Sequence, residues 1–217
     1  MVLQYLHEVY TLANKNYTGR VTVPTLWDAK KATIVNNESS EIIQMFNSEF
    51  NTIGHIDYDY YPKNLTAEID DINDMVYHNV NNGVYKAGFS TSQEAYEEAY
   101  DNLFNTFDKM EEILSRQRYL VGNKITAADW RAFPTLFRFD TVYHYAFKCN
   151  KKHIYEYPNL WNFTLDLYQH PGISKITNFE QIKRGYYYLM PNLNPSGIVA
   201  KGPELDFNQP HDRDRFS

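Results

Sequence analysis

Two short hydrophobic segments followed by a helix start constrain the N-terminal part of this chain most strongly. Val21–Leu26 and Ala32–Val35 are rich in β-branched residues, and the polar stretch Asp28–Lys31 separates them as a hairpin turn would. Pro24 has no amide hydrogen to donate to a ladder, so the first strand needs an edge, a bulge or a cis bend at this position. The pattern predicts two antiparallel strands and then a helix that begins at Glu38–Ser39.

The same segment offers polar groups that suit a peptide-like ligand. With a cis bond before Pro24, the backbone N–H and C=O groups of Val23 turn outward and can pair with an extended peptide. The free N–H groups of the helix start favour a carboxylate, Ser39 can add a hydroxyl donor, and Glu38 can accept from an ammonium group. A γ-glutamyl group carries both charges. A structural interpretation, a strand bend followed by a helix cap, explains the same residues equally well.

Composition excludes several classes of function. The chain has 217 residues, of which 43% are apolar and 16% aromatic, enough for a full core. The net charge is −6 and no basic stripe exists, which argues against nucleic acid as a partner. No segment approaches the ~18 apolar residues of a membrane span, and Met1–Tyr10 is unlike a signal peptide. The single cysteine, Cys149, fits a reducing compartment, so we expect a cytoplasmic protein.

Periodicity divides the chain into two domains. Residues 1–50 read as helix, strand, strand and helix, residues 51–65 form a linker rich in Gly, Asp, Tyr and Pro, and residues 66–217 read as helices with an extended tail. Helices are expected over residues 66–82, 92–114, 126–149, 159–169 and 178–188. Because a two-strand sheet with two helices cannot bury both of its faces, we expect an exposed edge and apolar face in the first domain.

A second local motif marks the helical part. Thr126 and Asp129 form a Thr-x-x-Asp capping box after the turn at Gly122, which predicts the start of a buried helix. Its loss should cost about 1 kcal/mol. His144 and His153 lack the spacing of metal ligands, so no metal is expected.

Taken in order, these motifs resemble the glutathionyl-hydroquinone reductases, or Xi-class glutathione transferases, which are relatives of the Omega class. The resemblance runs from about Tyr5 to the C-terminus. The matching segments are Asn16–Arg20, Val23–Trp27, Asn36–Ile42, Asn81–Phe89, Arg138–Asp140, Phe147–Asn150, Tyr157–Trp161, Asn194–Val199 and Gly202–Pro203. The resemblance implies an α+β fold, with a truncated thioredoxin-like N-terminal domain and an all-α glutathione-transferase C-terminal domain.

The resemblance also implies the ligands of the first domain. Glutathione would be the co-substrate. Val23, before a cis Pro24, would pair with its cysteinyl backbone, and Glu38 and Ser39 would hold its γ-glutamyl group.

A quinone-type aromatic molecule would be the second ligand, and a homodimer is possible. Tyr85 matches a tyrosine that lines the quinone side in the family, and Tyr186 or Tyr187 matches a second one. The family usually has His at the position of Gly185. Phenol hydroxyls suit this role because they can donate to a quinone oxygen while their rings pack on the aromatic ligand.

The chain departs from the family at the nucleophile. Members of the family use a cysteine in a Cys-Pro-Trp-Ala motif, whose thiolate attacks the thioether sulfur of a glutathionyl-hydroquinone. Here no cysteine precedes Cys149, which matches a cysteine of the helical domain and for which we expect a packing role. The neighbouring Lys148, Lys151 and Lys152 favour the alternative, a reactive thiol, because their positive charges would lower the pKa of Cys149.

Three hypotheses follow from this departure. The chain is a reductase or transferase of the family, or a non-catalytic remnant that binds glutathione or another protein, or a sequence whose true start lies upstream of Met1 and supplies the cysteine.

Overall fold

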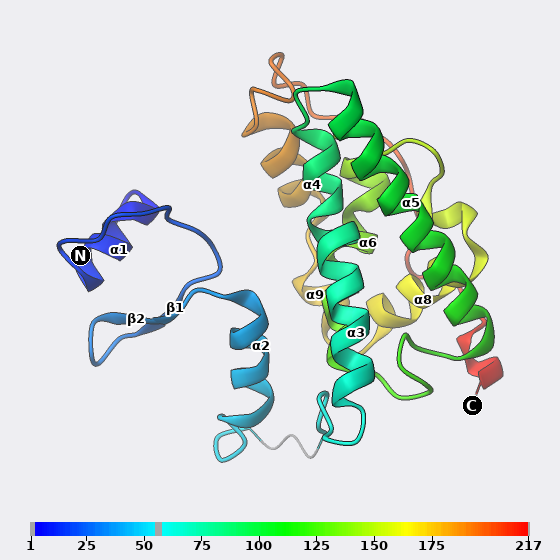
Figure 1. Cartoon of the computed structure of the whole chain (residues 1–217), viewed down its shortest axis with the longest axis horizontal. Coiled ribbons are helices and arrows are strands. Elements are labelled where there is room, and N and C mark those ends of the chain that lie inside the picture. Colours follow the sequence, from blue (N-terminus) through cyan, green and yellow to red (C-terminus); the bar gives the residue numbers. More distant parts are fainter. Residues whose placement is uncertain (1–2, 55–57, 217) are drawn as a thin grey trace. The chain divides into compact units, whose positions relative to one another are not determined.

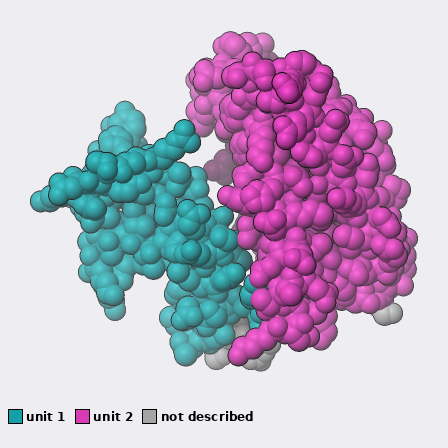
Figure 2. All heavy atoms as spheres, viewed as in Figure 1, with its two compact units in different colours: residues 1–61 teal, residues 62–217 magenta. Residues whose placement is uncertain are grey.

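The computed structural model describes residues 3–54 and 58–216, and the chain forms two compact units, Met1–Tyr61 and Pro62–Ser217 (Figure 1, Figure 2). Part of the predicted linker, residues 55–57, lies outside the described residues, as do the first two residues of the amphipathic N-terminal segment. Each unit has its own elements and is described separately.

The first unit combines two helices with one hairpin. Its elements are α1 (Leu6–Ala13), β1 (Leu26–Asp28), β2 (Thr33–Asn36) and α2 (Ser39–Ser48). The strands are antiparallel, with a bulge after Leu26. The side chain of Asp28 closes the turn, because its Oδ1 accepts from the backbone N–H groups of Lys30 and Lys31 at 2.8 and 2.9 Å. The predicted polar turn and second strand are therefore confirmed.

The prediction that the first strand covers Val21–Leu26 is wrong, since β1 begins only at Leu26. Pro24 has no N–H for a ladder. The backbone of Thr22 is also engaged elsewhere, because its carbonyl accepts from the Tyr10 hydroxyl at 2.8 Å and its N–H donates to the same oxygen at 3.3 Å. The cis bend that the sequence allowed is present at the Val23–Pro24 peptide bond.

The second unit is built from helices, and together the two units give the α+β class expected from the sequence. Its helices are α3 (Thr66–Val76), α4 (Gly83–Gly88), α5 (Gln93–Arg116), α6 (Ala127–Arg138), α7 (His144–Ala146), α8 (Pro158–Gln169), α9 (Ile173–Ile176) and α10 (Phe179–Lys183). Wider π-helical turns cover Tyr77–Asn81, Phe139–Tyr143 and Arg184–Tyr188, and 3₁₀ turns cover Ile154–Glu156 and Arg213–Phe216. In Figure 1, α3 and α4 run as one column beside α5.

Most predicted helices of this unit are confirmed at their start. The α3 helix begins at Thr66 and α5 follows its N-cap Ser92, whose Oγ accepts from the N–H of Ala95 at 3.3 Å. The predicted end at Cys149 is wrong, because the helix stops at Ala146. Lys148 has a φ of 59°, a left-handed conformation that cannot continue a right-handed helix.

The core of the second unit gathers along α5. The predicted apolar stripe of this helix is confirmed, with Leu103, Phe107, Met110 and Leu114 fully buried. This face packs on α8, one of several helices that surround it. Across the described ranges, no helix combines the length and the apolar character that crossing a bilayer would require.

The capping box forms as predicted, and its Asp129 carboxylate also binds the backbone of the turn before the helix. The fully buried carboxylate of Asp129 accepts from the N–H of Thr126 at 2.7 Å and from the N–H of Leu120 at 2.8 Å. Burial raises the pKa of this carboxyl to about 6, against the effect of its hydrogen bonds. One side chain thus fixes both the start of α6 and the turn that precedes it.

The tail after residue 190 is extended, as predicted, and it is anchored in the core. Arg213 is completely buried and donates from Nη2 to the carbonyls of Leu114, Gln117 and Arg118 at 2.8, 2.5 and 2.9 Å. These carbonyls lie at the C-terminal end of α5, where a helix leaves its last acceptors free. A cation at this end also complements the helix dipole.

We expect Asp129→Ala to lower the free energy of unfolding by about 2–4 kcal/mol, because it leaves two buried N–H groups without an acceptor. Chemical denaturation of the purified chain measures this change. Asp101→Ala, an exposed position on α5, is the matched control and should change stability by about 0.5 kcal/mol or less. Equal effects of the two substitutions would contradict the role assigned to Asp129.

Candidate functional site

The first candidate group surrounds the cis peptide bond of the first unit. Val23 is 75% exposed and lies before β1, so its backbone is outside the two-strand ladder. Glu38 is the N-cap of α2 and Ser39 is its first residue, and both side chains are exposed. The Glu38 side chain makes no cap hydrogen bond of its own, which leaves the N–H groups of the first helical turn available to an anion.

A buried tyrosine that the sequence analysis did not single out connects the two parts of this group. The hydroxyl of Tyr10 donates to the carbonyl of Thr22 at 2.8 Å and accepts from Nδ2 of Asn37 at 3.2 Å. Asn37 Nδ2 also reaches the Thr22 hydroxyl at 3.2 Å. Thr22 precedes Val23 and Asn37 precedes Glu38. Tyr10 therefore fixes the distance between the exposed backbone at Val23 and the start of α2 at Glu38.

The second candidate group is a cluster of three tyrosines in the second unit, Tyr85 on α4, Tyr143 at the end of a π turn and Tyr186 after α10. The hydroxyl oxygens of Tyr85 and Tyr186 are 2.6 Å apart, those of Tyr143 and Tyr186 are 2.8 Å apart, and those of Tyr85 and Tyr143 are 3.4 Å apart. The structure thus selects Tyr186 as the neighbour of Tyr85. Tyr187 points elsewhere, because its buried hydroxyl donates to the carbonyl of Thr141 at 3.0 Å.

One phenylalanine holds the three rings of this tyrosine cluster together. The Phe147 ring lies 5.4 Å from the ring of Tyr85, 5.1 Å from that of Tyr143 and 5.9 Å from that of Tyr186, between centroids. Gly88 makes room for it, since a Cβ at that position would lie 2.5 Å from the Phe147 ring. In the sequence, a glycine at the last position of α4, Gly88, is the one local indication that another side chain packs closely there.

Burial changes the acidity of two members of the tyrosine cluster, Tyr143 and Tyr186. It raises the pKa of Tyr143 far above its usual range and that of Tyr186 to about 12. The hydrogen bond from Tyr143 and the charge of Arg138 act on Tyr186 in the opposite direction and lower its pKa. The hydroxyls of Tyr143 and Tyr186 are therefore neutral near pH 7, and a neutral phenol can donate as well as accept.

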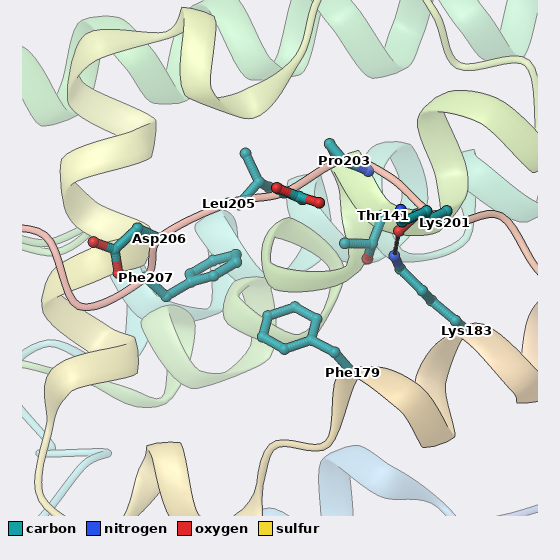
Figure 3. Close-up of a pocket in the computed structure, with 9 residues that line it drawn as sticks. Thr141, Phe179, Lys183, Lys201, Pro203, Leu205, Asp206 and Phe207 are labelled. Atoms are coloured by element: carbon teal, nitrogen blue, oxygen red, sulfur yellow. Dashed lines mark hydrogen bonds between the residues drawn. The ribbon is translucent and has the colours of Figure 1, made fainter.

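Two hollows of the second unit are large enough for a small molecule. One, of about 550 Å³, is lined by Tyr186, by other aromatic and aliphatic side chains, and by the polar residues Arg138, Thr177, Asn178 and Gln181. The other, of about 510 Å³, lies under the tail (Figure 3). There Lys183 Nζ donates to the carbonyl of Lys201 at 2.6 Å, so this ammonium group already fastens the tail to α10.

The single cysteine occupies the core, as expected. Cys149 is fully buried, and burial raises the pKa of its thiol to about 12, with Lys148 offsetting only part of the effect. Its S–H donates to the carbonyl of Phe147 at 3.8 Å. Among the side chains that the structure describes, no three His, Cys, Asp or Glu residues come together as a metal site.

Comparisons with known proteins place this geometry in a family. Residues 93–164 match the family model of the glutathione S-transferase C-terminal domain. The glutathionyl-hydroquinone reductase YqjG of Escherichia coli is 50% identical over 211 residues, which are 97% of this chain and 64% of that protein. The glutathionyl-hydroquinone reductase PcpF of Sphingobium chlorophenolicum is 51% identical over 199 residues, 92% of this chain and 64% of that protein.

Solved structures agree with these sequence matches. The glutathione-bound structure of YqjG has a TM-score of 0.95 and 50% identity, covering 98% of this chain and 69% of that one. The glutathione transferase Xi 1 of Trametes versicolor has a TM-score of 0.91 and 47% identity, covering 96% of this chain and 73% of that one. The chain belongs to the Xi-class glutathione transferases. It spans about 64% of the length of the two curated relatives named above.

Within this Xi-class chain, the residues predicted for ligands form two separate groups. Val23, Pro24, Glu38 and Ser39 lie in the first unit, where Tyr10 links their two segments. In the second unit, Tyr85 and Tyr186 meet through their hydroxyls. Tyr143 and Phe147, like Tyr10, were not assigned to a site from the sequence, because the segments that they connect are distant along the chain.

We expect Cys149 to resist alkylation by iodoacetamide at pH 8 in the folded chain, since a pKa of about 12 leaves about one thiol in ten thousand ionised. The rate should rise with pH toward 12 and become fast in denaturant at pH 8. Mass spectrometry of the labelled chain measures it, with a small free thiol as reference. Labelling at the rate of the reference thiol would contradict the buried, protonated state.

Proposed function

We propose that this chain binds glutathione at the first candidate group. The exposed backbone of Val23 would pair with the cysteinyl part of the tripeptide, as a strand pairs with its neighbour. The helix start at Ser39 would hold the γ-glutamyl carboxylate, and Glu38 its ammonium group. The glutathione-bound structure of the E. coli relative, at 50% identity, supports this assignment.

We further propose that the tyrosine cluster receives an oxygen of a quinone-type aromatic ligand. The observation that carries this proposal is the convergence of three hydroxyls, with Tyr186 2.6 Å from Tyr85 and 2.8 Å from Tyr143. The hollow beside Tyr186, whose lining includes Phe133 and Phe137, gives a ring a place to pack. Two curated relatives at 50% and 51% identity are glutathionyl-hydroquinone reductases, which supports a ligand of this class.

The reaction that these groups would serve is the reduction of a glutathionyl-hydroquinone. A thiolate attacks the thioether sulfur, the sulfur–carbon bond of the ring breaks, and the ring carbon takes up a proton. Overall, one glutathionyl-hydroquinone and one glutathione give hydroquinone and glutathione disulfide, so the sulfur is oxidised and the ring is reduced. Negative charge that reaches a ring oxygen during bond breaking is stabilised by a hydroxyl donor at that oxygen. Supplying this donor is the role proposed for Tyr85 and Tyr186.

A second candidate function is glutathione binding without thiol chemistry by these 217 residues. The burial and high pKa of Cys149, the one cysteine of the sequence, favour it. Under either candidate the ligand groups stay the same. The two candidates differ only in turnover.

We expect calorimetry with millimolar glutathione to show binding by the wild-type chain. Ser39→Ala should weaken the affinity about 5- to 10-fold through loss of one hydrogen bond. Tyr10→Phe should weaken it too, by releasing the segments before Val23 and Glu38. Ser48→Ala, at the other end of α2, is the matched control and should bind like wild type. Absence of heat with the wild-type chain would remove the glutathione proposal.

A turnover assay with glutathione and a glutathionyl-hydroquinone separates the two candidates. Equal turnover by the wild type and Cys149→Ser, with loss in Tyr85→Phe, would support the reductase and exclude Cys149 as its nucleophile. Glutathione binding without turnover would support the binding function. Turnover that disappears in Cys149→Ser would contradict the buried role of this thiol.

A further inference from the structure

The three hydroxyls of the tyrosine cluster carry three protons but form only two short hydrogen bonds among themselves. The oxygen pairs Tyr143–Tyr186, at 2.8 Å, and Tyr85–Tyr186, at 2.6 Å, have the length of good O–H···O bonds. The third pair, Tyr85–Tyr143, is 3.4 Å apart and is beyond that range. Two bonds use two protons, so one of the three protons remains for another acceptor.

Burial decides which proton remains. Tyr143 is 3% exposed, and in the described part of the chain its hydroxyl has hydrogen-bond partners only in Tyr85 and Tyr186. If Tyr143 accepted from Tyr186, its own proton would be buried without a good acceptor, and an unsatisfied buried donor is unfavourable. Tyr143 therefore donates to Tyr186. The remaining proton belongs to Tyr85 or Tyr186, which are both partly exposed.

We propose that Tyr143 is a positioning residue that makes the tyrosine cluster a donor toward a bound phenolic oxygen. By occupying an acceptor position of Tyr186 from the buried side, Tyr143 keeps a proton at the open end of the cluster. Donation from Tyr143 also makes the Tyr186 hydroxyl a stronger donor, because hydrogen bonds in a chain polarise one another. This inference rests on the proposed aromatic site and specifies its chemistry. The site prefers an oxygen that bears negative charge, as a phenolate does.

The surroundings of the tyrosine cluster support a preference for phenolate. Phe147 and Phe89 pack on the ring of Tyr85, which limits screening by water. Burial, the largest effect, raises the pKa of Tyr186 to about 12, whereas the hydrogen bond from Tyr143 and the positive charge of Arg138 on α6 act in the opposite direction and lower it. The donor Tyr143 and the cation Arg138 are therefore the groups that favour negative charge at this end of the cluster, against the effect of burial.

A nitrophenol that ionises near neutral pH tests this inference, because its own absorbance reports its ionisation when bound. Titration of 4-nitrophenol against the glutathione-loaded chain from pH 5 to pH 9 gives separate affinities for phenol and phenolate. Displacement by hydroquinone and loss of binding in Tyr85→Phe assign the probe to the tyrosine cluster. We expect the wild type to bind the phenolate more tightly. In Tyr143→Phe this preference should fall about 3- to 10-fold, the effect of one hydrogen bond.

Control variants separate positioning from packing. Tyr143→Phe keeps the ring against Phe147, and thermal unfolding checks its fold. Tyr145→Phe removes a neighbouring hydroxyl that is on a 74% exposed residue and should leave the preference unchanged. Should Tyr143→Phe fail to fold, Tyr186→Phe interrupts the same hydroxyl chain in its middle and should reduce the preference equally.

The outcomes distinguish this inference from the function on which it rests. An equal preference for phenolate in the wild type and Tyr143→Phe would overturn the role of Tyr143 and leave the aromatic site in place. Binding of the probe by the wild type without any preference would also overturn it. Absence of hydroquinone-competed binding by the wild type would remove the aromatic site itself, and the role of Tyr143 with it.

Discussion

The second unit depends on the buried carboxylate of Asp129. It accepts from the backbone of both Leu120 and Thr126, so it closes the turn after α5 and starts α6 with the same two oxygens. Helix α6 continues into the π turn that ends at Tyr143. The position of one hydroxyl of the tyrosine cluster therefore derives from a capping box seventeen residues earlier in the chain, or about five helical turns.

The C-terminal tail reinforces the same region from the other side. The buried guanidinium of Arg213 satisfies carbonyls at the end of α5, including those of Leu114 and Arg118. The side chain of Arg118 in turn makes a bidentate salt bridge to Asp166 on α8, with N···O distances of 2.9 and 3.0 Å. A buried charge is stable only when it is paired or hydrogen-bonded. Arg118 is paired with Asp166, and Arg213 is hydrogen-bonded to backbone carbonyls. The extended tail is thus part of the core that supports the site.

Both candidate groups use tyrosine hydroxyls in the same way, to link segments that are distant in the sequence. Tyr10 joins the segment of the cis peptide bond to the start of α2, and Tyr186 joins α4 to the π turn before α7. A buried hydroxyl can donate once and accept twice, which suits it to such a junction. It also creates a directional preference, because the proton of the most buried member must go to a neighbour. That preference is what gives Tyr143 its proposed role.

The sequence by itself determined the features that depend on neighbours within a few residues. Helix starts at Ser92 and Thr126, the stripe of α5 and the polar turn after Asp28 all follow from caps and spacing over three or four residues. The start of β1 was misjudged, because the hydroxyl that engages Thr22 belongs to a residue twelve positions away.

Only the tertiary structure decided between Tyr186 and Tyr187 and brought Tyr143 to the cluster. The partners in that cluster are 43, 58 and 101 residues apart along the chain. Neither periodicity nor capping carries information over such separations. Adjacent tyrosines on a helical turn point about 100° apart, so the packing of Phe147 and the buried bond from Tyr187 to Thr141 determine which hydroxyl reaches Tyr85.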